Sequence, residues 1–421
     1  MTQPPVSVIV VSRGRPKALR RTLMGISQLV YSQFEVIVVT DAEGMDAVQF
    51  LDFSHQLKLV LFDEANISAA RNHGIAAAAG EIVAFIDDDA VPETGWLWHL
   101  MAPFDQPEVS AAGGFVRGRN GITFQWQARS VDGAARHSDI ALNSDKPVEM
   151  SPAQGRAIKT EGTNMAFRRD MIAEMGGFDP AFHFYLDETD LNMRFAEMGA
   201  VTTIVPLAEV HHGYLESARR LASRAPRDLS GIGASMAVFL RKHCPEAERA
   251  AVWKAFQRNQ RLRLVDFMVR GEMMPGDVAK LMRGLRQGYG QGLERDIAVL
   301  PRIPRAADGF RSFESISSGS VVVGGRFWRR RAILREARCH ARAGRVASAF
   351  VFSRTGLFHR VAYDAEGYWV QTGGLFGRSG RGGKLFRLVG FRKRLQQEKQ
   401  RVARQRMLLD EGAIAFGKDK T

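Results

Sequence analysis

The stretch EIVAFIDDDAVPETGW, residues 81–96, decides the fold and raises the first question about function. Its apolar run, Ile82–Ile86, ends abruptly in the acids Asp87, Asp88 and Asp89. A short apolar run bounded by polar residues is typical of a buried strand in a parallel sheet. Two like charges about 4 Å apart repel by roughly 4 kcal/mol at an effective dielectric near 20. Three acids in a cleft therefore need a cation to offset this cost, unless they form a solvated turn before the next helix.

Similar runs precede and follow this stretch, and they alternate with helical patterns. The expected strands are residues 6–12, 34–41 and 57–64, and the expected helices are residues 15–29 and 67–80. Strands that alternate with helices predict an α/β fold with a mostly parallel sheet and right-handed crossovers.

Acids follow several of these strands. Asp41 and Asp63 end the second and third strands, and Asp87–Asp89 end the fourth. Ligands of such sheets bind beyond the carboxyl ends of the strands, so these acids are expected to share one crevice. Hard divalent ions such as Mg²⁺ and Mn²⁺ take carboxylate oxygens and leave positions for phosphates. The pattern favours a metal site that anchors a diphosphate.

The composition of the 421 residues indicates a globular protein, since 45% are apolar. The two cysteines, Cys244 and Cys339, have no partner spacing, so we expect no disulfide framework and a reducing cytosol. We expect neither a signal peptide nor a transmembrane helix, because no apolar run is long enough. The predicted location is cytoplasmic, with peripheral binding at the inner face of the membrane as an extension.

Charge divides the chain into two unlike halves. Residues 1–215 carry 17 Lys and Arg against 27 Asp and Glu, a net charge of −10, and the remainder carries 42 against 18, a net charge of +24. The acidic half argues against a nucleic-acid enzyme, and the basic half indicates an anionic partner or a solvated basic face.

The second half has no recognisable motif. We expect a domain at residues 1–221, a basic helical region at 222–300, a small α+β region at 301–383 and a basic amphipathic helical tail at 384–421. The helix expected at residues 384–409 is a candidate for binding anionic lipid; a solvated helix or an oligomer contact is an equal alternative. Nucleic acid is an unfavoured partner, because the arginine-rich stretch at 326–345 has no stacking platform.

Seven short stretches in the first half of the chain match, in order and spacing, the motifs of a known family. They are VSVIVVSRGRP, VIVVTD, SAARNHGIAAAAGEIVAFIDDD, GTNMAFRRD, GGFD, LDETDLNMR and VHHG. Together they resemble glycosyltransferase family 2, the inverting sugar transferases with the Rossmann-like GT-A fold, over about residues 6–216. The resemblance implies a nucleotide-diphospho-sugar donor and a divalent metal, Mn or Mg.

The resemblance also implies roles for the acids and for one arginine. Asp87 and Asp89 match the family's D-x-D signature, with Asp87 and Asp88 expected to contact the nucleotide-sugar and Asp87 and Asp89 the metal. Asp41 matches the acid that meets the nucleotide base, although TDAE departs from the family pattern at this point. Asp63 ends the third strand, where family members also contact the base. Arg71 matches an arginine near the nucleotide, and a salt bridge within a helix is its structural alternative.

An inverting transfer needs a base that takes a proton from the acceptor hydroxyl. The family places this base in an E-D-x-D-L pattern, which reads Asp187-Glu188-Thr189-Asp190-Leu191 here, with the first two acids exchanged. Glu188 aligns with the family base and is the predicted catalytic residue, and Asp187 is the reserve. The alternative is an acidic first turn that favours the helix dipole.

The resemblance extends to one histidine of the AEVHHG stretch, because the family carries a histidine here that completes the metal site or contacts phosphate. His212 is the better match by its V-x-H spacing from Val210. Adjacent strand residues such as His211 and His212 point to opposite faces, so at most one of them is expected to serve. Asn164 and Gly113–Gly114 are expected in the acceptor-side wall or in turns.

The predicted function is transfer of a single sugar to a saccharide or lipid-linked acceptor in the synthesis of cell-envelope polysaccharide or glycolipid. The chain lacks the Q-x-x-R-W motif of the family's processive polymerases, so polymerisation is not expected. A nucleotidyltransferase and a degenerate glycosyltransferase that serves as a binding scaffold are the alternatives.

Overall fold

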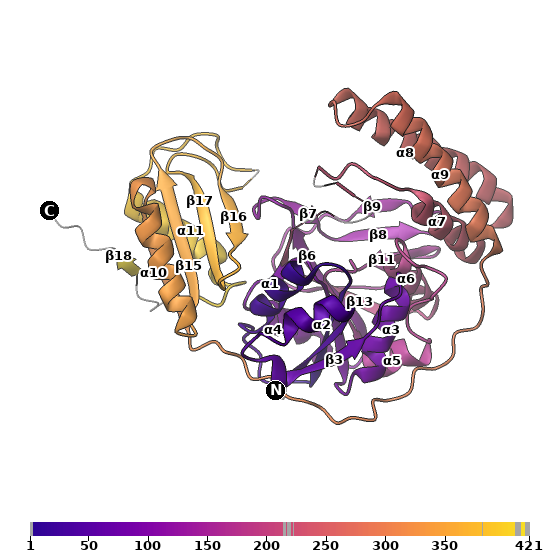
Figure 1. Cartoon of the computed structure of the whole chain (residues 1–421), viewed down its shortest axis with the longest axis horizontal. Coiled ribbons are helices and arrows are strands. Elements are labelled where there is room, and N and C mark those ends of the chain that lie inside the picture. The colour runs from indigo at the N-terminus through magenta and orange to yellow at the C-terminus, as the bar shows by residue number, and fades with distance from the viewer. Residues whose placement is uncertain are drawn as a thin grey trace.

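A computed structural model describes residues 3–213, 216, 220–221, 223–380 and 382–408, and the backbone of residues 414–416. Figure 1 shows a large α/β domain, a group of helices at its upper right, and a small α/β domain at its left. A long connection that runs below the large domain joins the helices to the small domain.

A central sheet forms the core of the large domain. Its strand order is β10-β13-β6-β12-β4-β1-β2-β3, with β5 paired to β13 and β7 to β6. The strands are β1 (Val6–Ser12), β2 (Phe34–Thr40), β3 (Leu57–Leu61), β4 (Ile82–Asp87), β5 (Ala90–Pro92), β6 (Val109–Arg117), β7 (Phe124–Trp126), β10 (Val148–Met150), β12 (Met165–Arg168) and β13 (Val201–His212). Strands β3, β2, β1 and β4 are parallel, and β12 is antiparallel to β4 and β6. The predicted mostly parallel α/β sheet is confirmed.

Helices cover both faces of this sheet because alternate strand residues point to opposite sides. Val8 and Val10 of β1 belong to one apolar cluster, and Ile9 belongs to the other. The helices are α1 (Pro16–Ile26), α2 (Ala42–Val48), α3 (Ile67–Ala77), α4 (Trp96–Met101), α5 (Arg169–Glu174) and α6 (Asp187–Glu197). Helices α1 and α4 contribute to the first cluster, and α3, α5 and α6 contribute to the second.

The chain also forms a separate three-stranded sheet and, after β13, three further helices. The strands are β8 (Arg129–Asp132), β9 (His137–Asp139) and β11 (Arg156–Lys159), and the helices are α7 (Ser230–His243), α8 (Glu246–Val269) and α9 (Pro275–Glu294). Glycines allow α7 and α9 to approach closely, since a Cβ atom on Gly288 would lie 1.9 Å from the Ser230 carbonyl oxygen. Among the described residues, no helix has the length and apolar run needed to cross a bilayer.

The small domain has its own sheet, in the order β16-β17-β15-β14-β18. Its elements are β14 (Ser320–Arg326), α10 (Arg330–Arg342), β15 (Val346–Ser353), β16 (Arg360–Tyr363), β17 (Tyr368–Gly374), α11 (Phe391–Ala403) and β18 (Ile414–Phe416). Strands β14, β15 and β17 are parallel. Phe313, in the connection that leads to this domain, packs against Phe34 and Phe53 of the large domain.

The structure corrects the prediction of one helix over residues 384–409. The structure forms α11 only over Phe391–Ala403, after an irregular segment that Gly390 ends. The side chains of Leu395 and Val402 are 1% and 2% exposed in the core of the small domain. The apolar side of this helix therefore packs on a sheet that the local pattern could not reveal.

Candidate active site

The three acids of the opening stretch lie where β4 turns into β5. Asp87 is the last residue of β4. Strand β5 then pairs antiparallel with the end of β13, with Ala90 opposite His212. This pairing brings a histidine that is distant in sequence to the acidic turn.

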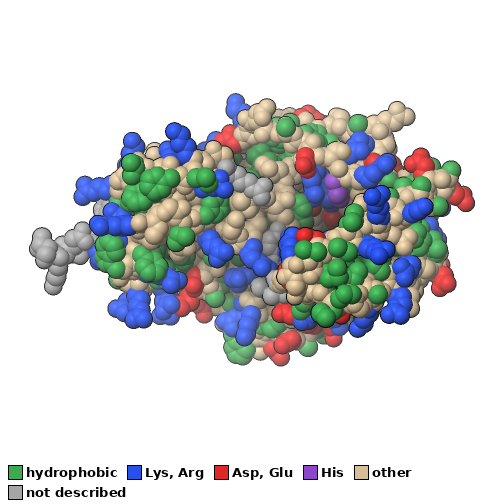
Figure 2. Space-filling view, turned by 90° about the horizontal axis from the view of Figure 1, so that it is seen from above, with side chains coloured by type: hydrophobic (Ala, Val, Ile, Leu, Met, Phe, Trp, Pro, Cys, Tyr) green, Lys and Arg blue, Asp and Glu red, His purple; other side chains and the backbone are tan. Residues whose placement is uncertain are grey.

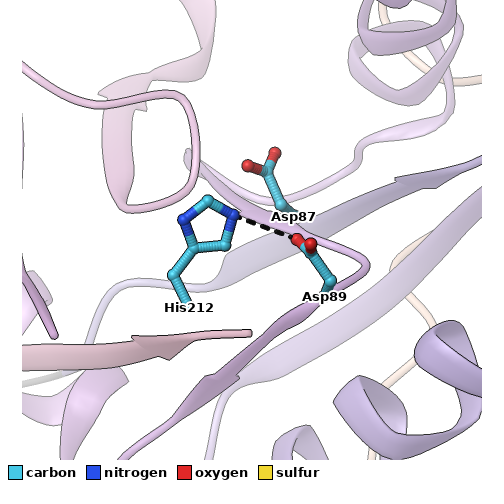
Figure 3. Close-up of side chains that lie close together, drawn as sticks. All are labelled: Asp87, Asp89 and His212. Carbon is cyan, nitrogen blue, oxygen red and sulfur yellow. Dashed lines mark ion pairs between the residues drawn. The ribbon is translucent and has the colours of Figure 1, made fainter. Parts of the chain in front are cut away.

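Asp87, Asp89 and His212 form one cluster, and their ligand atoms all lie within 4.8 Å of one another. The side chains converge from the turn and from β13, and the dashed line in Figure 3 marks the ion pair between His212 and Asp89. His212 Nε2 lies 3.2 Å from Asp89 Oδ1. Two carboxylates and one imidazole are donors that suit Mn²⁺ or Mg²⁺.

Asp88 has a different environment from its two neighbours. Its side chain is fully buried, it accepts a hydrogen bond of 2.7 Å from Ser12 Oγ, and it forms an ion pair of 2.6 Å with Arg15. Burial raises the pKa of Asp88 to about 7, although Arg15 opposes this shift. Asp88 is therefore buried beneath the acidic turn and forms an ion pair with Arg15. The same arginine also contacts Asp89 at 3.3 Å.

Arg71 joins the acidic turn to α6. Its side chain is 5% exposed, and it contacts Asp87 at 3.3 Å and forms a hydrogen-bonded ion pair with Asp187. It also donates a hydrogen bond of 3.1 Å to the carbonyl of Gly162. The structure therefore brings together three of the predicted site residues.

Glu188 follows Asp187 at the start of α6 and is paired with Lys159 of β11 at 2.7 Å. Burial alone would raise the pKa of Glu188, but the Lys159 ammonium lowers it to about 2. Burial raises the pKa of Asp187 to about 7 against the effect of Arg71. The Glu188 side chain is 19% exposed and the Asp187 side chain 4%, so Glu188 is the more accessible carboxylate.

The backbone before these acids has an unusual conformation. Tyr185 and Leu186 have φ values of 72° and 67°, in the left-handed region that non-glycine residues rarely adopt. Such conformations cost on the order of 1–3 kcal/mol each and persist only where the surrounding structure holds them. Two in succession fix the start of α6 and hence the positions of Asp187 and Glu188.

The two acids at the ends of β2 and β3 lie at the same edge of the sheet, but their contacts differ. Asp41 caps α2 by accepting a hydrogen bond from the backbone N–H of Gly44 (2.9 Å), and it accepts another from the backbone N–H of Gly14, in the loop after β1 (2.6 Å). Asp63 is exposed and pairs with Arg13 at 2.9 Å. Both acids thus bind groups of the loop that follows β1, Asp41 at Gly14 and Asp63 at Arg13.

His211 points away from its neighbour, as the strand geometry requires. It contacts Glu93 at 2.8 Å, and its ring lies 4.7 Å from that of Trp369 in the small domain. His211, Glu93 and Glu209 could also hold a metal by proximity. However, Arg406 pairs with Glu93 at 2.7 Å, and Arg117 pairs with Glu209 through two bonds. These arginines already neutralise both carboxylates.

Some contacts of the site were beyond sequence reasoning. Arg15 lies in the matched stretch VSVIVVSRGRP without a predicted role, and Lys159 lies in none of the matched stretches. Asn164 is fully buried, and its amide nitrogen donates to the carbonyls of Phe115 (3.0 Å) and Ala208 (2.8 Å), so it braces the sheet instead of lining an acceptor wall.

The space-filling view from above shows a hollow in the large domain, in which acidic, basic and histidine side chains meet (Figure 2). The small domain, at the left of this view, carries basic and apolar side chains on the same face.

Comparison with known proteins identifies the class. The family model described as "Glycosyltransferase like family 2" matches residues 4–262. The match covers more than half of the chain, and the chain therefore belongs to this family, as its sequence resemblance indicated. The N-terminal domain has the GT-A-type fold of these enzymes.

Curated relatives match only part of their own length. The chain is 27% identical over 227 residues to the pre-mycofactocin glycosyltransferase of Mycobacterium tuberculosis, covering 52% of this chain and 45% of that protein. It is 29% identical over 182 residues to the glucosyl-dolichyl phosphate glucuronosyltransferase of Haloferax volcanii, covering 41% and 56%. The matched region is thus about half of either relative.

Among solved structures, the chain is similar to the mannosyltransferase PcManGT from Pyrobaculum calidifontis in complex with GDP-Man and Mn²⁺. The identity is 18%, the TM-score is 0.44, and the alignment covers 70% of this chain and 88% of that one.

Proposed function

We propose that this protein transfers a single sugar from a nucleotide-diphospho-sugar to an acceptor hydroxyl, with inversion and with a divalent metal. The observation that carries the proposal is the meeting of Asp87, Asp89 and His212 beside the Arg71–Asp187 pair. Family membership supports the reaction class.

The cluster of Asp87, Asp89 and His212 is the site we assign to the metal, Mn²⁺ or Mg²⁺. Its two carboxylates supply negative charge, and its imidazole supplies a nitrogen ligand, so the donor set fits either ion. When bound, the ion neutralises charge on the diphosphate leaving group.

Protein side chains would hold the rest of the donor. Asp41 and Asp63 lie at the ends of neighbouring parallel strands, where we propose that they contact the nucleotide base. We assign Arg71 to the donor side of the cleft, where its planar guanidinium orients Asp87 and Asp187.

We assign the role of base to Glu188, which takes the proton of the acceptor hydroxyl as that oxygen attacks the anomeric carbon. Lys159 keeps this carboxylate ionised, the form that can accept a proton. Asp187 is buried and forms an ion pair with Arg71, so we assign it the role of positioning that arginine.

A saccharide or a lipid-linked acceptor fits a role in cell-envelope polysaccharide or glycolipid synthesis. The name of one relative, a glucosyl-dolichyl phosphate glucuronosyltransferase, supports the lipid-linked class.

Donor binding tests the proposal. Thermal unfolding would be recorded with UDP-, GDP- and dTDP-sugars in the presence and absence of Mn²⁺. At a ligand concentration of 100 Kd, binding adds about 2.7 kcal/mol of stability, which is a measurable shift. We expect one donor to raise the melting temperature only with Mn²⁺, and Asp89→Ala to abolish the shift while Asp52→Ala, at an exposed position, retains it. No shift with any donor would contradict the proposal, and binding without transfer would favour the degenerate scaffold.

A further inference from the structure

One end of the small domain carries an unusual surface, which we call the tip. It consists of residues 326–331, 354–358 and 384–393. The first segment begins at the last residue of β14, and the second directly follows β15. The third lies between β17 and α11 and includes the start of that helix. Because β14, β15 and β17 are parallel, the segments that follow them gather at one edge of the sheet.

Large apolar side chains on the tip are exposed. Their exposed fractions are 57% for Phe327, 66% for Trp328, 64% for Leu357, 73% for Leu385, 55% for Phe386 and 85% for Leu388. The three segments are in contact. The Arg354 guanidinium lies 5.7 Å from the Trp328 ring, and a Cβ on Gly356 would lie 3.6 Å from the Phe386 ring. The apolar side chains therefore belong to one surface.

The tip is also purely basic. Its segments contain nine Lys and Arg residues and no Asp or Glu. Four described acids of the small domain lie outside these segments, and one of them, Glu336, lies within α10. Asp364 and Glu366 occupy the turn between β16 and β17, at the opposite end of the sheet, and Glu398 is buried in ion pairs with Arg394 and Arg401.

We propose that the tip binds the surface of an anionic lipid bilayer. Exposed Leu, Phe and Trp side chains can enter the boundary between headgroups and acyl chains, while surrounding cations pair with anionic headgroups. A nucleic acid is a poorer fit, because the two most exposed residues, Leu385 and Leu388, have no ring that could stack on a base.

The position of the tip connects this surface with the proposed transfer reaction. Basic and apolar side chains of the small domain lie on the same face as the hollow of the large domain (Figure 2). A bilayer that contacts this face of the small domain would thus lie on the side from which the hollow opens. Only this link to a lipid-linked acceptor rests on the proposed function, and the lipid binding itself does not.

Vesicle flotation of the full chain tests the inference. We expect the protein to float with phosphatidylcholine vesicles that contain phosphatidylglycerol, to remain behind with pure phosphatidylcholine, and to release as salt rises. Arg387→Ala should weaken binding about fivefold, the effect of about 1 kcal/mol per basic residue. The double variant Leu385→Ser/Leu388→Ser should weaken it on the order of tenfold or more.

Matched controls lie outside the tip. Phe50→Ser removes an aromatic residue that is 72% exposed in the large domain, and Arg286→Ala removes an exposed charge from α9, and both should bind vesicles normally. Donor-dependent thermal shifts should be unchanged in all four variants, which separates this inference from the proposed function. Absence of flotation, or binding that survives both tip variants, would overturn it. So would loss with Arg387→Ala but not with the leucine variant, which would show attraction by charge alone, without entry of apolar side chains into the bilayer.

Discussion

At the scale of single residues, two adjacent histidines illustrate how the site is built. His212 faces Asp87 and Asp89, whereas His211 faces Glu93 and the ring of Trp369. Their separation follows from the alternation of side chains along β13. Substituting each histidine in turn therefore compares the same residue type at adjacent positions of one strand, with only the direction of the side chain different.

We expect His212→Ala to weaken Mn²⁺ affinity at least tenfold, because even supporting groups around metal ligands contribute 10–100-fold. His211→Ala should leave Mn²⁺ affinity near its original value and lower the free energy of unfolding by roughly 1–3 kcal/mol, because buried Glu93 loses a hydrogen-bond partner. Calorimetric titration with Mn²⁺ and urea unfolding would measure the two effects. Equal losses of Mn²⁺ affinity would disprove the division of roles.

The acids at the start of α6 lead to a second prediction. Glu188→Gln should preserve donor affinity and reduce the rate of transfer by on the order of 10²–10⁴-fold, the contribution of a general base. Asp187→Asn should disturb donor affinity as well, because it releases Arg71 from its buried partner. Single-turnover assays with the donor found by thermal shift would check this. A fully active Glu188→Gln enzyme would move the base to another residue.

At this scale, the residues that could be predicted from the sequence are those that belong to a recognisable motif. The D-x-D acids and His212 stand in recognisable contexts, and the structure brings their side chains together. The roles of Lys159 and Arg15 could not be predicted, because they depend on ion pairs with Glu188 and Asp88, which are distant in the chain. Nor could sequence reveal that Asp88, between two clustered acids, is itself fully buried.

At the scale of elements, β5 and β13 link the candidate metal cluster to the small domain. Glu93, just after β5, pairs with Arg406, whose guanidinium lies 4.3 Å from the Trp369 ring. The backbone N–H of Gly95 donates to the carbonyl of Gln405 at 2.8 Å. The same pair of strands thus carries the candidate metal ligand and the contact between domains.

This buried ion pair predicts a pH-dependent effect of substitution. Arg406→Leu should cost roughly 3–5 kcal/mol near neutral pH, because it leaves the Glu93 carboxylate buried without its main partner. The cost should shrink on acidification, since protonated Glu93 needs no cation. Urea unfolding followed by tryptophan fluorescence would report the loss. Arg404→Leu is the control, because its ion pair with Asp145 is exposed and should contribute at most about 1 kcal/mol.

The wild-type protein should show the matching pH dependence. Burial alone would raise the pKa of Glu93, but Arg406 and His211 lower it well below its ordinary value. A depressed folded-state pKa contributes stability above the unfolded-state pKa, and this stability is lost as pH falls. Burial also lowers the pKa of His211, so protonation of this group opposes folding in the same direction. Urea unfolding between pH 7 and pH 4 should show decreasing stability, and a constant stability would contradict this assignment.

The elements of the large domain were predictable because their patterns are local. Strands β1, β2 and β4 are continuous apolar runs, and α3 lies within a predicted helix at residues 67–80. In the second half, a helical pattern at residues 384–409 indicated a free amphipathic helix, but α11 is shorter and packs on the small sheet. The pattern correctly showed an apolar side and could not show what covers it.

At the scale of the whole molecule, the charge asymmetry read from the sequence corresponds to a physical division. The acidic half forms the GT-A domain with the candidate metal cluster, and much of the basic half forms the small domain with its tip. The family and fold were predictable because motif order survives in the sequence. The docking of the small domain was not, because it depends on contacts between residues as distant as Glu93 and Arg406.

The central claim is that acids and a histidine from separate parts of the chain hold one divalent ion at the edge of the sheet. Pulsed electron paramagnetic resonance of Mn²⁺ bound to the protein and a nucleotide-sugar tests it most directly. We predict coupling of Mn²⁺ to one imidazole nitrogen, which His212→Ala removes and His211→Ala retains, together with coupling to donor phosphorus. A nitrogen coupling that persists in His212→Ala, or Mn²⁺ that binds without contact to the donor, would contradict the account.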